Sequence, residues 1–253
     1  MSSVTPLANH SVIPRIYPER RIGSFSRAEG RFLFYSLVAD LLTQDSVVLD
    51  YGAGRGAQIE NSSGYMSRLI NFSGRCKRYI GVDPDPVVKQ NPYLDEAHVL
   101  GADGTIPLPD ASVDVIVAYA VLEHVADPDS AVREIRRVLK PGGWFCAWTP
   151  NRNGYVGLAA RLVPNRFHAS IVKVAEPTGG RAEKDVFPVC YRMNTRRAIR
   201  TAFGRDFDDY SFYYNGTPSY HFNRLFLARF WMAVMAVLPM AMAKSLFVFV
   251  RKH

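Results

Sequence analysis

The sequence predicts a doubly wound α/β fold, in which helices cover both faces of a mostly parallel sheet. Apolar, strand-like runs alternate with helical patterns in units of about 30 residues between residues 27 and 150. The run SVVLDYGAGRG, residues 46–56, passes directly from an expected strand into a glycine-rich turn, and acidic residues stand where three expected strands end. Parallel strands need crossover connections, and right-handed crossovers place helices on both faces of the sheet.

Each expected element follows from a local pattern. Residues 27–42 carry an apolar face at helical spacing, and the apolar run at 47–49 follows them as the first strand. The later elements are expected in this order: a helix near 64–71, strand 78–83, a short helix after Pro84, strand 97–103, strand 113–120, a helix capped by Asp127 or Asp129 and ended by Pro141 and Gly142, and strand 144–150.

The alternation breaks after residue 150. Residues 152–205 contain eleven Lys or Arg against three Asp or Glu, which predicts a basic cap insertion that receives an anionic acceptor. The alternative is an ordinary solvated basic surface. The chain is expected to divide into a lead-in over 1–26, a cofactor-binding core over 27–150, the basic cap over 151–193 and a C-terminal part over 194–253 that completes the sheet. The C-terminal part is expected to contain helix 194–204, an edge strand in 207–216, an apolar helix over 220–243 and a last strand over 245–252.

Composition narrows the class of protein. The chain has 253 residues, 48% of them hydrophobic and 21% charged, which favours one globular domain with a good core. Cys76, Cys146 and Cys190 are odd in number and lack paired metal-ligand spacing, so neither a disulfide scaffold nor a metal site is expected, and a cytoplasmic setting fits best. The first residues carry no signal-peptide pattern. A net charge of +8 favours an anionic partner without choosing among nucleic acid, membrane and acidic substrate.

The glycine-rich turn is the first candidate site. Glycines between a parallel strand and the next helix let a ligand approach the backbone closely. Gly52, Gly54 and Ala57 satisfy the dinucleotide pattern G-x-G-x-x-G/A, so a nicotinamide or flavin site is a genuine alternative. Asp50, two residues before the first glycine, argues against that alternative because a carboxylate repels a pyrophosphate.

Two further acids indicate a different ligand. Asp83 ends the second strand, where a carboxylate can accept both hydroxyls of a ribose. Asp103 ends the third strand in GADGT, where it can accept from the exocyclic amine of adenine. Three carboxylates around one nucleoside suit a ligand that lacks phosphate and carries positive charge. S-adenosylmethionine has a sulfonium and an α-ammonium group, so we predict it as the cofactor.

The motifs over residues 27–150 resemble those of class I S-adenosylmethionine-dependent methyltransferases. They read VVLDYGAGRG, IGVDPDP, GADGTIPLPDASVDVIVAYAVLEHVADP and EIRRVLKPGGWFCAWTPN. Their order is that of the branch that includes ubiquinone and menaquinone C-methyltransferases and many small-molecule and sugar methyltransferases. The resemblance implies a seven-stranded Rossmann-like methyltransferase sheet of order 3-2-1-4-5-7-6, with strand 7 antiparallel.

The resemblance also implies roles for individual residues. Asp50, Gly52, Gly54 and Gly56 would line the methionine moiety, Asp83 and Pro84 would hold the ribose, Asp103 and Gly104 would hold the adenine, and Tyr119 and Ala120 would form the floor beside the sulfonium. Two alternatives stay open. Asp50 could be a turn or helix-capping acid, and Asp83 could be the N-cap of the helix that follows it.

Residues on the acceptor side are less clearly marked. His124, in VLEHV after the fourth strand, is a candidate general base, with a structural role at the helix entry as the alternative. His168 lies within the basic cap and is a second candidate. Tyr191 and Arg192 are candidate substrate residues, because the stretch KDVFPVCYRMNT loosely resembles methyltransferases of polysaccharide or glycolipid assembly and an arginine fork suits a carboxylate or phosphate.

The apolar helix over 220–243 admits three interpretations. Its uninterrupted apolar part, residues 230–243, is too short to span a bilayer and contains Pro239. Because Arg224, Arg229 and Lys244 stand at its edges, the helix could be buried in the core, pair with a second copy in a homodimer, or lie peripherally on a membrane through residues 224–244.

The predicted function is S-adenosylmethionine-dependent O-methylation of a small-molecule, sugar or glycolipid-like acceptor, with His124 or His168 as base. C-methylation of a prenylated quinone or similar ring is the alternative within the class. A non-catalytic adenosylmethionine-binding protein and an NAD-dependent oxidoreductase are the alternatives outside it. Nucleic acid is a disfavoured partner, because the pattern Asn/Asp-Pro-Pro-aromatic is absent after the fourth strand and the basic cap lacks interleaved aromatics. The expected location is the cytoplasm, with contact at the inner face of the membrane as an option.

Overall fold

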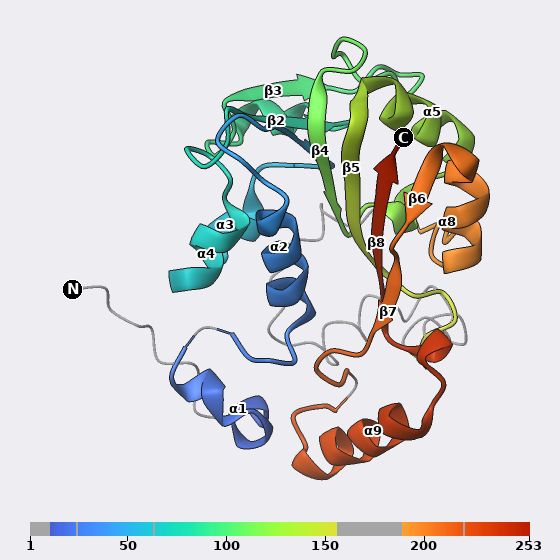
Figure 1. Cartoon of the computed structure of the whole chain (residues 1–253). Coiled ribbons are helices and arrows are strands. Elements are labelled where there is room, and N and C mark those ends of the chain that lie inside the picture. The colour runs from blue at the N-terminus through green and yellow to red at the C-terminus, as the bar shows by residue number, and fades with distance from the viewer. Residues whose placement is uncertain (1–10, 24, 63, 156–188, 220) are drawn as a thin grey trace.

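The protein is built around one central sheet. The computed structural model describes residues 11–23, 25–62, 64–155, 189–219 and 221–253. Its eight strands lie in the order β3-β2-β1-β4-β5-β8-β6, and β7 pairs with β8 as well (Figure 1). The strands are β1 (Val47–Tyr51), β2 (Arg78–Asp83), β3 (Glu96–Val99), β4 (Val113–Tyr119), β5 (Leu139–Pro150), β6 (Phe207–Asp209), β7 (Phe212–Tyr214) and β8 (Ser245–Lys252).

The direction of the strands confirms the predicted topology. Strands β1 to β5 pair in parallel, whereas β8 runs antiparallel to β5 and lies between β5 and the edge. Both β6 and β7 are antiparallel to β8. The order 3-2-1-4-5-7-6 is therefore confirmed, since β8 takes the place of the seventh strand and β6 with β7 takes the place of the sixth.

Helices cover both faces of the sheet, as predicted. The helix α2 and the short helix α4 pack on one face, and α5 and α8 pack on the other. The α-helices are α1 (Ile13–Ile16), α2 (Gly30–Asp40), α3 (Ala57–Glu60), α4 (Gly64–Ile70), α5 (Pro128–Val138), α8 (Arg196–Phe203) and α9 (Leu225–Val237). The 3-10 turns are η1 (Pro18–Arg21), η2 (Pro86–Gln90), η3 (Leu122–His124), η5 (Gly204–Asp206) and η6 (Met240–Met242).

Alternate residues of the central strands face two separate apolar cores. Leu49 and Ile116 belong to the core under α5 and α8, whereas their neighbours Val48 and Val115 belong to the core under α2 and α4. This follows from the two-residue period of a strand, which sends successive side chains to opposite faces. Burial on both faces explains why these strands read as continuous apolar runs in the sequence.

Two elements end earlier than the sequence predicts. α5 ends at Val138, before Pro141, because the backbone is already extended at Leu139, where β5 begins. Lys252 Nζ on β8 donates 2.7 Å hydrogen bonds to the carbonyl oxygens of Arg136 and Leu139. Those bonds satisfy carbonyls that a helix end leaves without partners. β3 ends at Val99, and residues 100–105 form a turn at the carboxyl edge of the sheet.

The apolar C-terminal helix differs most from prediction. α9 spans Leu225–Val237 only, and Phe226 and Val237 expose 77% and 82% of their surface. Ala228 and Met235 are its only buried residues. Burial of this helix in the core is therefore wrong as an interpretation. Within the described residues, no helix has the length and apolar character needed to cross a membrane.

Candidate cofactor and acceptor site

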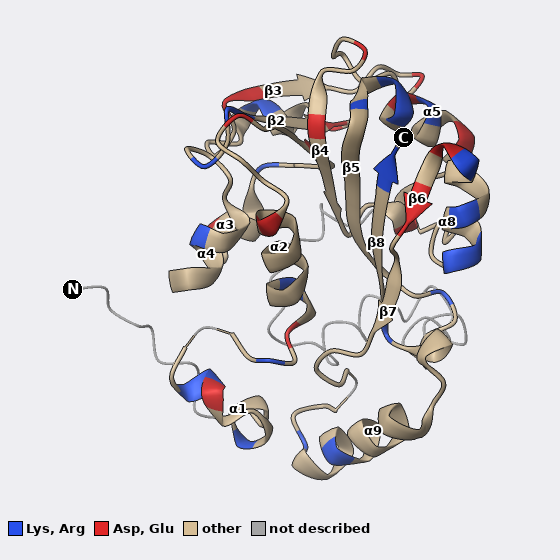
Figure 2. Cartoon of the chain, in the orientation of Figure 1, with Lys and Arg blue, Asp and Glu red and all other residues tan. Residues whose placement is uncertain are grey.

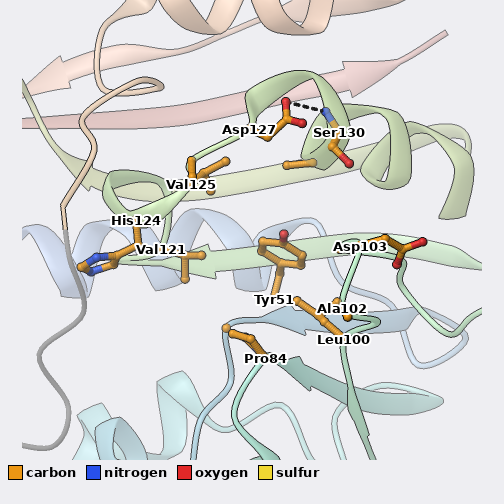
Figure 3. A pocket seen from close by; sticks show the side chains of 14 residues that line it. Tyr51, Pro84, Leu100, Ala102, Asp103, Val121, His124, Val125, Asp127 and Ser130 are labelled. Atoms are coloured by element: carbon orange, nitrogen blue, oxygen red, sulfur yellow. Dashed lines mark hydrogen bonds between the residues drawn. The ribbon is translucent and has the colours of Figure 1, made fainter.

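A cavity of about 340 Å³ opens at the carboxyl edge of the parallel strands. One wall comes from the ends of β1 and β4, a second from the turn after β3, and a third from the start of α5 (Figure 3). This is the edge at which doubly wound folds bind ligands. The cavity is lined by Tyr51, Gly52, Pro84, Leu100, Ala102, Asp103, Gly104, Val121, His124, Val125, Ala126, Asp127, Ser130 and Ala131.

The glycine turn is shaped by positions at which a side chain has no room. Gly52 has a φ of 86°, and an added Cβ would collide with the side chain of Val121 across the cavity wall. Gly56 has a φ of 81°, and its Cβ would lie 2.6 Å from Asn91 Oδ1. Both positions combine a left-handed backbone with close neighbours, so only glycine fits without strain.

Asp83 holds the glycine turn in place. Its Oδ2 accepts a 2.9 Å hydrogen bond from the Gly54 amide, and its Oδ1 accepts a 2.8 Å bond from the Asp85 amide. Burial raises the pKa of Asp83, and these two amide bonds oppose the rise. Each carboxylate oxygen keeps a further acceptor position for a ribose hydroxyl. The N-cap of η2 is Asp85, which accepts from the Val87 amide at 2.9 Å, so the capping alternative for Asp83 is wrong.

Asp50 lies behind the turn, in a second and smaller cavity. Its Oδ2 accepts a 2.8 Å hydrogen bond from the hydroxyl of Tyr79, and Tyr35 lines the same cavity. Burial raises the pKa of Asp50 to about 6; the Tyr79 hydrogen bond opposes this rise, and the charge of Asp83 adds to it. Asp50 caps no helix, because the N-cap of α3 is Gly56. Gly52 lines both cavities, so the cavity that contains Asp50 adjoins the larger one at the glycine turn.

Asp103 lies in the lining of the larger cavity. The Thr105 amide donates a 3.0 Å hydrogen bond to its Oδ1, and this bond holds the pKa of Asp103 below its usual value. The side chain is exposed to solvent, and its carboxylate oxygens can accept further hydrogen bonds. Asp103 and His124 lie at opposite ends of the lining (Figure 3).

Of the predicted acceptor residues, His124 lines the cavity, and Tyr191 and Arg192 are hydrogen-bonded to the segment 123–126 beside it. His124 lines the cavity at the end of η3, and the preceding carbonyl, that of Glu123, accepts from the amides of Cys190 at 2.7 Å and Tyr191 at 3.2 Å. Arg192 Nη1 donates a 2.7 Å hydrogen bond to the carbonyl of Ala126, which also lines the cavity. His168 and most of the basic cap lie outside the described residues.

Tyr119 and Ala120, unlike most of the other predicted cofactor residues, line neither cavity. Tyr119 stacks on Trp148 with ring centroids 4.7 Å apart and packs in the core on the α2 side of the sheet. Ala120 adopts a left-handed φ of 59° and donates its amide to the Trp148 carbonyl. Neither residue contributes to the lining of the two cavities, where Val121 stands instead. Their place beside a sulfonium stays a prediction.

Sequence reasoning missed the apolar walls of the cavity. Tyr51, Leu100, Val121 and Val125 line it, and each lies within one or two residues of a predicted position or motif residue. The apolar residues beside the predicted acids could have indicated these walls, because a flat purine ring needs apolar surfaces on its faces as well as acceptors at its edge. Carboxylates near the turn and apolar walls between them fit adenosine. Among the described residues, no cluster of His, Cys, Asp and Glu could hold a metal ion.

Comparisons with known sequences agree with this geometry. Residues 49–147 match the family described as a methyltransferase domain. A probable S-adenosylmethionine-dependent methyltransferase of Mycolicibacterium smegmatis is 39% identical over 137 residues, which cover 52% of this chain and 48% of that protein. A second such relative, from Mycobacterium tuberculosis, is 36% identical over 106 residues, covering 42% of this chain and 36% of that protein. The chain thus spans about half or less of the length of these relatives.

Solved structures share the fold at low sequence identity. A putative methyltransferase of Haloferax volcanii, solved with the Trm112 methyltransferase activator, superposes with a TM-score of 0.53 at 19% identity, covering 88% of this chain and 90% of that one. An S-adenosylmethionine-dependent methyltransferase of Mesorhizobium loti gives 0.50 at 16% identity, covering 86% and 96%. The sheet order and the glycine turn are those of the class I methyltransferase fold, and residues 49–147 within that fold match the methyltransferase-domain family.

Proposed function

We propose that this protein transfers the methyl group of S-adenosylmethionine to a hydroxyl group of a small-molecule, sugar or glycolipid-like acceptor. The observation that carries the cofactor half is the cavity at the carboxyl edge of the sheet, which Gly52, Pro84 and Asp103 line. Asp83 comes directly before Pro84 and accepts from the Gly54 amide in the glycine turn. The cofactor supplies a methyl group that is already activated as a sulfonium. The protein therefore has to bind, orient and desolvate the reacting groups.

The protein residues divide this work by position. Asp83 accepts from the ribose hydroxyls, and Asp103 accepts from the adenine amine at the far end of the cavity. Asp50, behind the glycine turn, receives the α-ammonium group. Leu100, Val121 and Val125 give the purine apolar walls and exclude water.

The acceptor half rests on His124, which lines the cavity, and on Tyr191 and Arg192, which are hydrogen-bonded beside it. The acceptor oxygen forms a bond to the methyl carbon as the sulfur–carbon bond breaks, and the hydroxyl proton passes to the imidazole of His124, the proposed base. S-adenosylhomocysteine is the second product. Arg192 already donates to the Ala126 carbonyl and keeps further N–H groups for an anionic acceptor.

Calorimetric titration tests the cofactor half. We expect binding of S-adenosylmethionine and S-adenosylhomocysteine but not of NAD(H), and a loss of at least about tenfold in affinity for Asp83→Ala. Asp85→Ala is the matched control, because Asp85 lies two residues away, its side chain caps η2, and the variant keeps the backbone amide that donates to Asp83. Equal affinities for the wild type and Asp83→Ala, or binding of NAD(H) alone, would contradict the proposal.

Transfer of labelled methyl from S-adenosylmethionine to sugar and glycolipid hydroxyls tests the acceptor half. His124→Ala should lower kcat by about a hundredfold while leaving cofactor affinity unchanged. An undiminished kcat on an identified acceptor would remove the base role from His124 and leave the methyltransferase assignment intact.

A second candidate is C-methylation of a prenylated quinone or similar ring. The exposed apolar surface of α9 favours it, because a prenyl tail holds its ring near a membrane. The position of the label in the product, on carbon or on oxygen, separates the two reactions. Both place the protein in the cytoplasm, where the three cysteines stay free, and both permit contact with the inner face of the membrane.

A further inference from the structure

The outward face of α9 is an apolar stripe. Phe226, Phe230, Ala233 and Val237 are all exposed and follow one another at intervals of four, three and four residues. This spacing places them on one side of a helix. We call these four residues the α9 stripe.

The opposite side of α9 fixes the helix to the protein. Ala228 and Met235 are buried, and the Trp231 ring stacks on Tyr155 with centroids 4.8 Å apart. The orientation of the helix is therefore set by packing, and the α9 stripe has no freedom to turn inward. An exposed apolar stripe on a packed helix is the usual mark of an interaction surface.

The N-terminal segment extends this surface. The Val12 amide donates a 2.8 Å hydrogen bond to Asn223 Oδ1, just before α9, so α1 and the start of α9 are joined. Figure 1 shows both at the lower end of the molecule. Ile22, after η1, exposes 90% of its surface and adds an apolar side chain to the same end.

The exposed charges at this end of the molecule are positive. Arg15, Arg21, Arg224 and Arg229 are exposed in the described residues 11–23 and 221–244 (Figure 2). The only acid in those two ranges is Glu19, which lies 3.7 Å from Arg27. The surface therefore combines apolar side chains with exposed cations and offers no exposed carboxylate to a partner.

We propose that α9, together with residues 11–22, docks on an anionic lipid surface. A helix that lies in the membrane interface inserts its apolar face among the acyl chains while flanking arginines contact lipid phosphates. A second copy of this chain is the less suitable occupant. In a two-fold interface this surface would meet a copy of itself, so the four arginines of each copy would come together with no exposed acid from residues 11–23 or 221–244 to pair with, and like charges brought together oppose association.

Flotation with lipid vesicles tests the proposal on the whole chain. The wild type should bind vesicles that contain phosphatidylglycerol, bind phosphatidylcholine alone at least about tenfold more weakly, and lose affinity as salt rises. Phe226→Ser/Phe230→Ser should weaken binding by about tenfold because both side chains leave the acyl region. Arg224→Glu/Arg229→Glu should weaken binding to the anionic vesicles by at least as much.

Matched controls lie on other parts of the surface. Tyr210→Ser removes a side chain that is 55% exposed at the sheet edge, and Arg197→Glu/Arg205→Glu reverses two exposed charges around α8. Both should bind vesicles as the wild type does. Circular dichroism checks that every variant is folded, and the arginine variant tests the surface independently if the serine variant unfolds.

Two results would overturn the proposal. One is equal binding of the wild type to anionic and neutral vesicles, or none to either. The other is a wild-type dimer in sedimentation that Phe226→Ser/Phe230→Ser turns into a monomer, without vesicle binding by either form. The test needs no methyl acceptor, so its outcome is independent of the proposed methyl transfer.

Discussion

The hydroxyl of Tyr79 donates a 2.8 Å hydrogen bond to Asp50 Oδ2, which ties the acid before the glycine turn to the neighbouring strand. Asp50 is half-buried behind that turn, and its pKa rises to about 6 because desolvation outweighs the Tyr79 bond. An acid with a raised pKa is a proton-binding group of the folded state, and this has a consequence for stability.

We predict that Asp50→Asn stabilises the ligand-free protein above pH 6. The folded state holds the Asp50 proton up to about pH 6, whereas an unfolded chain releases it near the ordinary value of 3.8. The free energy of unfolding of the wild type therefore falls as pH rises between these two values. Asparagine carries no proton that the folded state must release, so its stability does not fall in this way. The free energy of unfolding of the variant should exceed that of the wild type by about 2 kcal/mol at pH 8 and by almost nothing near pH 4.

Urea denaturation at the two pH values measures this gain. Asp45→Asn makes the same substitution in the exposed turn before β1, and it should change the free energy of unfolding little at either pH. A gain of equal size at both pH values for Asp50→Asn would show that a lost proton is not its cause.

A second prediction concerns the collision at Gly52. Gly52→Ala forces both a left-handed backbone and a contact with Val121, whereas Gly74→Ala at φ 71° meets no atom within 4 Å of the added Cβ. We expect Gly74→Ala to cost about 1 kcal/mol from backbone strain alone and Gly52→Ala to cost about 3 kcal/mol. Gly52→Ala should also abolish cofactor binding, which Gly74→Ala should leave unchanged.

The double variant Gly52→Ala/Val121→Ala separates the two causes. Removing the Val121 side chain relieves the collision but leaves the backbone strain, so stability should return to about the level of Gly74→Ala, apart from the cost of the valine deletion. If the double variant is no more stable than Gly52→Ala, the collision with Val121 is not the source of the cost.

The strand order could be predicted because the signals were local and mutually consistent. Apolar runs such as Val47–Leu49 end at Asp50, and the next two strands are likewise followed by Asp83 and Asp103, so the sequence itself indicates a common edge of a parallel sheet. The structure then brings two of these acids, Asp50 and Asp83, close enough that the charge of Asp83 raises the pKa of Asp50.

The positions of Tyr119 and Ala120 and the exposure of α9 could not be predicted from the sequence in the same way. Tyr119 continues the two-residue period of β4 and faces the aromatic core, and the chain reaches the cavity only at Val121, after the left-handed turn at Ala120. No propensity of alanine signals that turn. The apolar composition of α9 predicts burial, but the contacts available to it, chiefly Trp231 on Tyr155, cover only one side.

The last prediction concerns Arg137, which anchors the chain that follows the adenine end of the cavity. Its Nη1 donates 2.8 Å hydrogen bonds to the carbonyl of Leu108 and to Asp110 Oδ1. Its Nη2 donates 2.7 Å bonds to the carbonyl of Ile106 and to Glu134 Oε2. Glu134 Oε2 accepts the Ile106 amide at 2.9 Å in turn, so residues 106–110 are held to α5 by one guanidinium and one carboxylate.

Arg137→Lys keeps the charge but cannot reproduce this planar set of donors. We expect it to lower the free energy of unfolding by about 2 kcal/mol, because carbonyls that are half-buried lose their donors. Affinity for S-adenosylmethionine should fall severalfold, since residues 100–104 in the cavity wall are continuous with the loosened segment. Arg197→Lys, on the exposed face of α8, is the control and should change neither quantity. Unchanged stability of Arg137→Lys would show that the positive charge, and not the planar donor set, holds residues 106–110 against α5.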